Sequence, residues 1–301
     1  MVFLKDTILK ELQTNPVTQQ MIHFGNNIGN LFPNEEALCL ASAFQMDKKT
    51  RIVVKKNRYE AQQLYQRLQP LVDDALLFVM EESLRVQAIA SSPEDKQEQI
   101  YVLTQLVKED KPRIIVCNTA AFFRYLPERE LFKSLCFQFE VDQEISMSEL
   151  KQKLNRAGYT RVNYVDRPCT YASRGGIVDV YCLEYEHPIR IEFFDTVIES
   201  IRLFHEETQR TIQTIDSVFI NPATDLLFTD DQIEYLQKEI DKELEKQQTK
   251  LIPDDYEFLL DYIEKDKISL ENYDIDPHLY IYYSYLKANK LTDYVNGNII
   301  F

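Results

Sequence analysis

The side chains best suited to a function lie in a short segment near the middle of the sequence. Their types suit the binding of another protein. Residues 188–194 read PIRIEFF, in which side chains alternate with the period of two that sorts a β-strand into two faces. The face expected to enter the core carries Ile189, Ile191 and Phe193, and the outward face carries Arg190, Glu192 and Phe194. Arginine and aromatic residues are enriched at binding hot spots. The pattern therefore predicts a protein-binding surface on the outer face of a sheet.

A further candidate is Arg174, which precedes a Gly-Gly pair where a tight turn would place it at the rim of the same sheet. A structural role explains the same residues equally well. Phe194 would then pack under the hairpin that follows it, and the arginines would pair with Glu192 and Glu199. The residue pattern by itself leaves both interpretations open.

A nucleotide site is the next possibility, because closely spaced glycines let backbone N–H groups approach a phosphate. The candidate loop is FGNNIGNLFP (24–33), which has Gly25 and Gly29 but no G-K-[ST] motif. No clear apolar strand precedes it. The loop is therefore predicted to connect two helices, and no nucleotide cofactor is expected.

Patterns typical of catalysis and of metal binding are also missing. The four histidines do not stand at H-x-x-x-H or H-E-x-x-H spacing, and no G-x-S-x-G elbow occurs. Acidic pairs such as Asp73-Asp74 are expected by chance in so acidic a chain. None of the five cysteines forms a C-x-x-C pair. We therefore expect no catalytic residue, no metal and no other cofactor, and free thiols as in a reducing cytoplasm.

Charge and hydropathy limit the partners of the chain. The formal net charge is −15, which disfavours a duplex-DNA binder because such proteins carry a basic face. The first residues resemble an amphipathic helix rather than a signal peptide, and no run of about 18 apolar residues occurs. We therefore expect a cytoplasmic protein without a membrane span.

The elements that must position these residues change in character along the chain. Up to residue 135, strands alternate with helices, which predicts a parallel sheet of the α/β type. The predicted strands are 51–56, 75–79 and 112–118, and the predicted helices are 35–45, 58–72 and 92–110, after a first helix that Pro16 breaks or restarts.

After residue 140 one helix, 147–161, precedes short strands in close succession. Ser146 or Ser148 is the expected N-cap of this helix and Gly158 its C-terminal stop. The predicted strands are 176–183, 188–195, 197–205 and 215–220, and their closeness in sequence favours an antiparallel meander.

The remainder of the chain is helical and acidic. A long charged helix is predicted at 229–248 with Thr229 as N-cap, and a Tyr-rich helical segment at 254–295. The final NIIF is typical of the start of a buried strand.

Four linked motifs identify a family. They are SRGGIVDV (173–180), PIRIEFFD (188–195), IESIRLF (198–204) and ETQR (207–210). Together they resemble the second domain of the bacterial transcription-repair coupling factors (Mfd), which is related to a domain of the excision-repair protein UvrB. The close resemblance covers about residues 147–225.

The resemblance implies a domain organisation. Residues 1–138 would be the first part of a degenerate helicase-like parallel α/β domain, 139–221 an inserted UvrA-binding α+β domain with an antiparallel sheet, and 222–301 the truncated second part of the α/β domain. The missing G-K-[ST] motif favours a coupling factor over UvrB, whose first domain has a functional Walker A loop.

The resemblance also implies a function. In this family two arginines and an aromatic residue bind UvrA, and by motif position they fall on Arg174, Arg190 and Phe194. A structural role stays open for Arg202 and Arg210. The chain would be a non-catalytic module that recruits UvrA in transcription-coupled nucleotide excision repair. Its longer parent would be an ATP-dependent DNA translocase that contacts RNA polymerase and DNA through other domains.

Two alternatives and one departure accompany this interpretation. A UvrB-type excinuclease fragment would require a P-loop and an aromatic hairpin, and a stand-alone DNA-binding domain conflicts with the acidic charge.

The departure is Cys169-Thr170, where the family has Gly-Glu. If the missing glutamate orders the loop or contacts UvrA, the affinity for UvrA is reduced.

Overall fold

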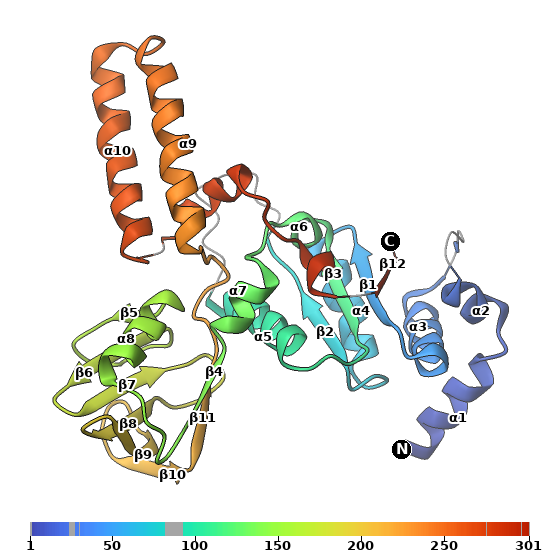
Figure 1. Ribbon diagram of the computed structural model, residues 1–301. Coiled ribbons are helices and arrows are strands. Elements are labelled where there is room, and N and C mark those ends of the chain that lie inside the picture. The colour runs from blue at the N-terminus through green and yellow to red at the C-terminus, as the bar shows by residue number, and fades with distance from the viewer. Residues whose placement is uncertain are drawn as a thin grey trace. The chain divides into compact units, whose positions relative to one another are not determined.

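A four-stranded parallel sheet forms the centre of the first of two units of the chain (Figure 1). The computed structural model describes residues 2–23, 28–29, 31–81, 93–274, 276–295 and 297–300. Within these, the first unit combines residues up to 81 with 93–124 and 290–300. The strands are β1 (Thr50–Lys55), β2 (Ala75–Phe78), β3 (Ile114–Asn118) and β12 (Gly297–Ile300), in the order β12-β1-β3-β2. All three neighbouring pairs are parallel, which confirms the predicted parallel sheet.

Helices pack against this sheet and close its core. They are α3 (Pro33–Asp47), α4 (Arg58–Leu68) and α5 (Pro93–Lys108), preceded by α1 (Val2–Leu12) and α2 (Pro16–Ile22) and followed after β3 by α6 (Thr119–Phe123). The break expected at Pro16 starts α2, whose N-cap side chain is Asn15. Ser92, the first residue of the helix predicted at 92–110, lies outside the described residues. Close packing of β12 on β1 requires Gly297, because a Cβ there would lie 2.6 Å from the carbonyl oxygen of Thr50.

The second unit, residues 125–289, contains a six-stranded sheet with the order β10-β9-β8-β7-β6-β5. Its strands are β5 (Thr160–Arg161), β6 (Thr170–Arg174), β7 (Ile177–Tyr181), β8 (Ile189–Phe194), β9 (Val197–Phe204) and β10 (Thr211–Ile215). From β6 to β10 all neighbours are antiparallel, so the predicted meander is confirmed there. The short strand β5 pairs with β6 in parallel.

The strand predicted at 215–220 is corrected by the structure. Ile215 ends β10, and a separate strand, β11 (Ser217–Ile220), pairs with β4 (Phe137–Glu140) in a two-stranded antiparallel sheet. The reason is burial: Val218 of β11 and Phe139 of β4 are paired in register and share the core of this unit.

The helix α8 (Met147–Arg156) closes the core of the six-stranded sheet through Leu150 and Leu154. Its N-cap and its C-terminal stop follow the sequence prediction, but the helix ends at Arg156 rather than at 161, and Thr160–Arg161 form β5. Ser146 Oγ accepts a hydrogen bond from the backbone N–H of Glu149 at 3.1 Å. Gly158, with φ +82°, terminates the helix in the left-handed region.

Two long helices, α9 (Asp230–Gln248) and α10 (Pro253–Glu271), form an antiparallel hairpin in the same unit (Figure 1). As predicted, Thr229 caps α9, in a capping box with Gln232. Ile233, Leu236, Ile240 and Leu244 of α9 are buried at helical spacing. The hairpin is followed by the 3-10 helices η2 (Pro277–Tyr285) and η3 (Leu291–Tyr294), and α7 (Arg129–Ser134) precedes β4. No helix in the described part of the chain is long and apolar enough to cross a membrane.

The chain is thus a mixed α/β protein with a parallel and an antiparallel sheet. Residues 222–289 belong to the same compact unit as the antiparallel sheet. From Lys290 onward the chain belongs to the unit of the parallel sheet. The domain boundaries expected at 138/139 and 221/222 stay predictions.

Candidate protein-binding surface

The outer face of β8 carries the predicted pattern. Ile189, Ile191 and Phe193 are 0%, 0% and 9% exposed and lie in the core. Arg190 and Glu192 are half-buried, and Phe194 is 73% exposed. The sequence-based assignment of the two faces is therefore confirmed, and a large aromatic ring stands in solvent at the end of the strand.

Arg174 lies at the rim of the same sheet, as expected. It ends β6, is exposed, and is followed by the two-residue turn to β7. Gly175 has φ +59°, a conformation that favours glycine. Gly176 is needed for packing, because a Cβ there would lie 3.0 Å from the carbonyl oxygen of Phe193. The Gly-Gly pair thus brings Arg174 and the end of β8 into one region of the sheet.

Arg190 is held by three groups, two on the strands β7 and β9 and one in the turn between β9 and β10. Its Nε and Nη2 atoms donate to the two carboxylate oxygens of Asp179 on β7, at 2.7 and 2.8 Å. Nη2 also donates to Oε1 of Gln209 at 2.7 Å, and the guanidinium lies 4.3 Å from the ring centroid of Phe204. The hydrogen bond to Asp179 raises the pKa of Arg190 above its usual value, so this side chain stays charged.

The contacts expected if these side chains had only a structural role are not the contacts observed. Phe194 is not packed under the following hairpin, and Arg190 pairs with Asp179. Glu192 instead pairs with Arg202 and accepts a hydrogen bond from Ser200. The register between β8 and β9 shifts after Glu192, so that Glu199 is the extra residue of a β-bulge and is exposed.

Sequence reasoning missed Asp179 and Gln209, the two hydrogen-bonding partners of Arg190. Asp179 alternates with the buried Val178 and Val180, which was a signal for the outer face of β7. Register across the strands then places Asp179, Arg190 and Arg202 in one row. Arg202 is tied to Glu192 within the face, whereas the carbonyl of Arg210 closes the β9–β10 hairpin by accepting from His205 N–H at 2.9 Å.

At the Cys169-Thr170 pair, where the resemblance implies Gly-Glu, Cys169 packs against the core, whereas Thr170 pairs with Tyr181 in the register of the outer face. Thr170 is 2% exposed and its hydroxyl donates to the carbonyl of Arg167 at 2.6 Å. Cys169 has φ +65°, the left-handed conformation that favours the family's glycine.

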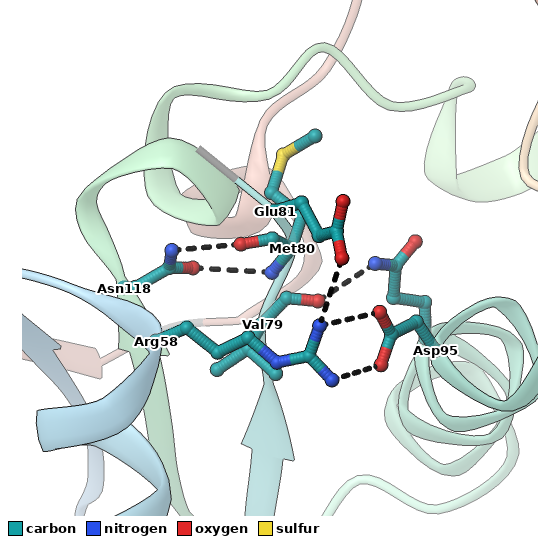
Figure 2. Close-up of polar contacts among 7 residues, drawn as sticks. Arg58, Val79, Met80, Glu81, Asp95 and Asn118 are labelled. Atoms are coloured by element: carbon teal, nitrogen blue, oxygen red, sulfur yellow. Dashed lines mark hydrogen bonds and ion pairs between the residues drawn. The ribbon is translucent and has the colours of Figure 1, made fainter. Parts of the chain in front are cut away.

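The carboxyl edge of the parallel sheet is the other place where such a fold binds ligands. Figure 2 shows Arg58 between Asp95 and Glu81, with Nη1 2.7 Å from Asp95 Oδ2 and 3.7 Å from Glu81. In the same view the Asn118 amide bonds both backbone groups of Met80, at 2.9 and 3.2 Å. The positive charge of Arg58 at this edge is therefore balanced by carboxylates.

The candidate phosphate loop at 24–33 lies largely outside the described residues, Gly25 included. The helix that follows it, α3, carries Glu35 and Glu36 in its first turn. Glu35 accepts a hydrogen bond from the N–H of Phe32 at 3.0 Å, and Glu36 pairs with Lys55 at 3.0 Å. Carboxylates of the chain itself thus lie where a helix N-terminus attracts anions.

Comparisons with known proteins agree with the motifs. Residues 137–226 match the family described as the UvrB interaction domain. The transcription-repair-coupling factor of Bacillus subtilis is 34% identical over 253 residues, which is 82% of this chain and 21% of that protein. The namesake from Staphylococcus epidermidis is 30% identical over 278 residues, 91% of this chain and 24% of that protein. The chain therefore spans about a quarter or less of the length of these curated relatives, and the resemblance found in the motifs is confirmed.

Proposed function

We propose that this chain is a docking module which recruits UvrA for transcription-coupled nucleotide excision repair. The premise is that the chain belongs to the family of the transcription-repair-coupling factors and corresponds to part of their length. The contact surface would be the outer face of β6 to β9. Arg174, Arg190 and Phe194 would be its main contact residues.

The observation that carries this proposal is the exposure of Phe194. A phenylalanine that is 73% exposed gains little from folding, yet β8 presents it on the same face as a pre-oriented arginine, Arg190. Arginine and aromatic anchors are the residues that dominate protein interfaces. The matched family domain contains the whole of this face.

We further propose that the parallel sheet is a degenerate helicase-like domain into which the antiparallel unit is inserted. In support, β12 pairs with β1 although the whole second unit lies between β3 and β12 in the sequence. The pairing of Lys55 with Glu36 and of Arg58 with Asp95 supports a non-catalytic role, because these cations are already neutralised. An ATP-dependent translocase activity, contacts with RNA polymerase and DNA, and a cytoplasmic location are proposals for the longer parent protein.

The test is a calorimetric titration of this chain with UvrA from the same organism. The wild type should bind, and Arg190→Ala and Phe194→Ala should each weaken binding by about 30-fold or more, as hot-spot residues do. Phe258→Ala is the matched control, because Phe258 is 76% exposed on α10 and lies outside the proposed surface. A folded wild type that does not bind UvrA would refute the proposed function.

A duplex oligonucleotide in the same calorimeter tests the DNA-binding alternative. The acidic chain should show no heat of binding at low or at moderate salt, whereas a DNA-binding domain would bind more tightly at low salt.

A further inference from the structure

The guanidinium of Arg190 is only partly used by the fold. Arginine has five N–H donors in a fixed fork. Asp179 and Gln209 accept from the single donor on Nε and from both donors on Nη2. The described part of the chain places no acceptor within hydrogen-bond distance of Nη1 of Arg190. The two donors on Nη1 are therefore available to a partner, and the rest of the group is immobilised.

We propose that Asp179 and Gln209 are positioning residues that hold Arg190 in its docking orientation before UvrA arrives. This inference rests on the proposed function and adds two residues that never need to touch UvrA. Asp179 fixes the plane of the guanidinium through a bidentate pair, and Gln209 fixes the Nη2 side. The ring of Phe204, itself 1% exposed, supports the guanidinium at 4.3 Å.

The β9–β10 hairpin is built so that Gln209 reaches Arg190. Gln209 has φ +57°, a conformation that an L-residue adopts at some cost in free energy. Its N–H donates to the carbonyl of His205 at 2.8 Å, and its Nε2 donates to the carbonyl of Glu206 at 2.7 Å. With the amide N–H and Nε2 both anchored in the loop, Oε1 is directed to Arg190.

Pre-orientation matters because a free arginine side chain loses rotamer freedom when a partner immobilises it. In this chain that freedom is already lost on folding, since Arg190 is bonded on three sides. Without Asp179 or Gln209, the side chain of Arg190 should regain rotamer freedom in the unbound chain. Binding to UvrA should then be weaker, although no contact with UvrA has been removed.

The experiment is a double-mutant cycle measured by calorimetry against UvrA at low ionic strength, where weakened charged contacts stay measurable. Asp179→Asn and Gln209→Ala should each weaken binding about three- to tenfold. In the Arg190→Ala background neither change should matter further. Glu207→Gln and Gln213→Ala, exposed changes in the same hairpin, should bind like the wild type.

A second measurement needs no partner. The Nε–H resonance of Arg190 in the free chain should be shifted and protected from exchange with water, and both features should be lost in Asp179→Asn. Folded variants that bind UvrA like the wild type, or that lose the same affinity in the Arg190→Ala background, would overturn the positioning role and leave the docking function intact. Wild-type affinity in Arg190→Ala itself would overturn both the contact and its positioning.

Discussion

Asp266 and His278 form a hydrogen-bonded pair in the second unit, with Oδ1 of the buried aspartate 2.6 Å from Nε2 of the half-buried histidine. Asp266 is 2% exposed, and its other carboxylate oxygen accepts a hydrogen bond from the Tyr282 hydroxyl at 2.6 Å. On the opposite side of the imidazole, Nδ1 lies 2.8 Å from Asp276, and the ring packs against Tyr262. The imidazole thus joins η2 to α10 through Asp266, and Asp276, the N-cap residue of η2, contacts its other nitrogen.

This pair predicts a pH dependence of stability. Burial by itself lowers the pKa of His278, but the hydrogen bonds to Asp266 and Asp276 and their charges outweigh burial and raise this pKa above 6.5. A raised folded-state pKa means that the contribution is complete below about pH 6.5 and is lost as the pH rises through the folded-state value. The free energy of unfolding from urea titrations should therefore fall above neutral pH.

His278→Gln is the variant that checks this origin. It should be less stable than the wild type at pH 6, with the difference shrinking as the pH rises. Phe258→Ala, an exposed change on α10 that removes no titratable group, is the control and should keep the wild-type pH dependence. A wild-type slope in His278→Gln would assign the effect to another group.

The adjacent residues Phe193 and Phe194 are expected to serve different properties, Phe193 the stability of the fold and Phe194 the binding of a partner. Phe193 is 9% exposed in the core and Phe194 is 73% exposed. Phe193→Ala should lower the free energy of unfolding by about 3 kcal/mol or more. Phe194→Ala should change it by less than about 0.5 kcal/mol. Urea unfolding of both variants measures this, and a large loss of stability in Phe194→Ala would show that the ring is packed in solution.

Gly158 is predicted to be irreplaceable for two separable reasons. Its φ is +82°, and a Cβ there would lie 2.5 Å from Cγ2 of Thr224. Gly158→Ala should destabilise the unit by about 2–3 kcal/mol, from the left-handed backbone and the clash together. The same change in a Thr224→Ser background should cost about 1 kcal/mol less, because the clashing methyl is gone. Equal losses in both backgrounds, measured by urea unfolding, would exclude the clash.

At Cys169, glycine is expected to be the better residue. It stands at φ +65°, a conformation that favours glycine. Cys169→Gly and Cys169→Ala remove the same thiol packing, but only glycine relieves the left-handed backbone. Cys169→Gly should therefore be more stable than Cys169→Ala by about 1 kcal/mol in urea unfolding. Alanine equal to or better than glycine would show that the loop relaxes without strain.

Much of the local structure followed from the sequence, because its causes are local. The two faces of β8 depend on the period of two, and the caps at Ser146, Thr229 and Gly158 depend on single side chains beside a helix end. The parallel sheet followed from alternating strands and helices, since parallel neighbours require a crossover.

The pairing partners did not follow, because they depend on register. The strand expected at 215–220 was divided between two sheets by the pairing of Val218 with Phe139 on β4, which is distant in sequence. The arginine partners were misjudged for the same reason. A β-bulge after Glu192 leaves Glu199 unpaired, and no local pattern signals it.

The sequence by itself determined which residues could recognise a partner. They are an arginine and a phenylalanine four residues apart on one outward strand face, with the family motifs around them. The tertiary structure decided how they are presented. Asp179 reaches Arg190 only through the β7–β8 register, and Gln209, in the turn between β9 and β10, reaches it only because β9 pairs with β8. Side-chain type and alternation are properties of the chain, whereas the orientation of a charged group depends on which strands the packed core brings side by side.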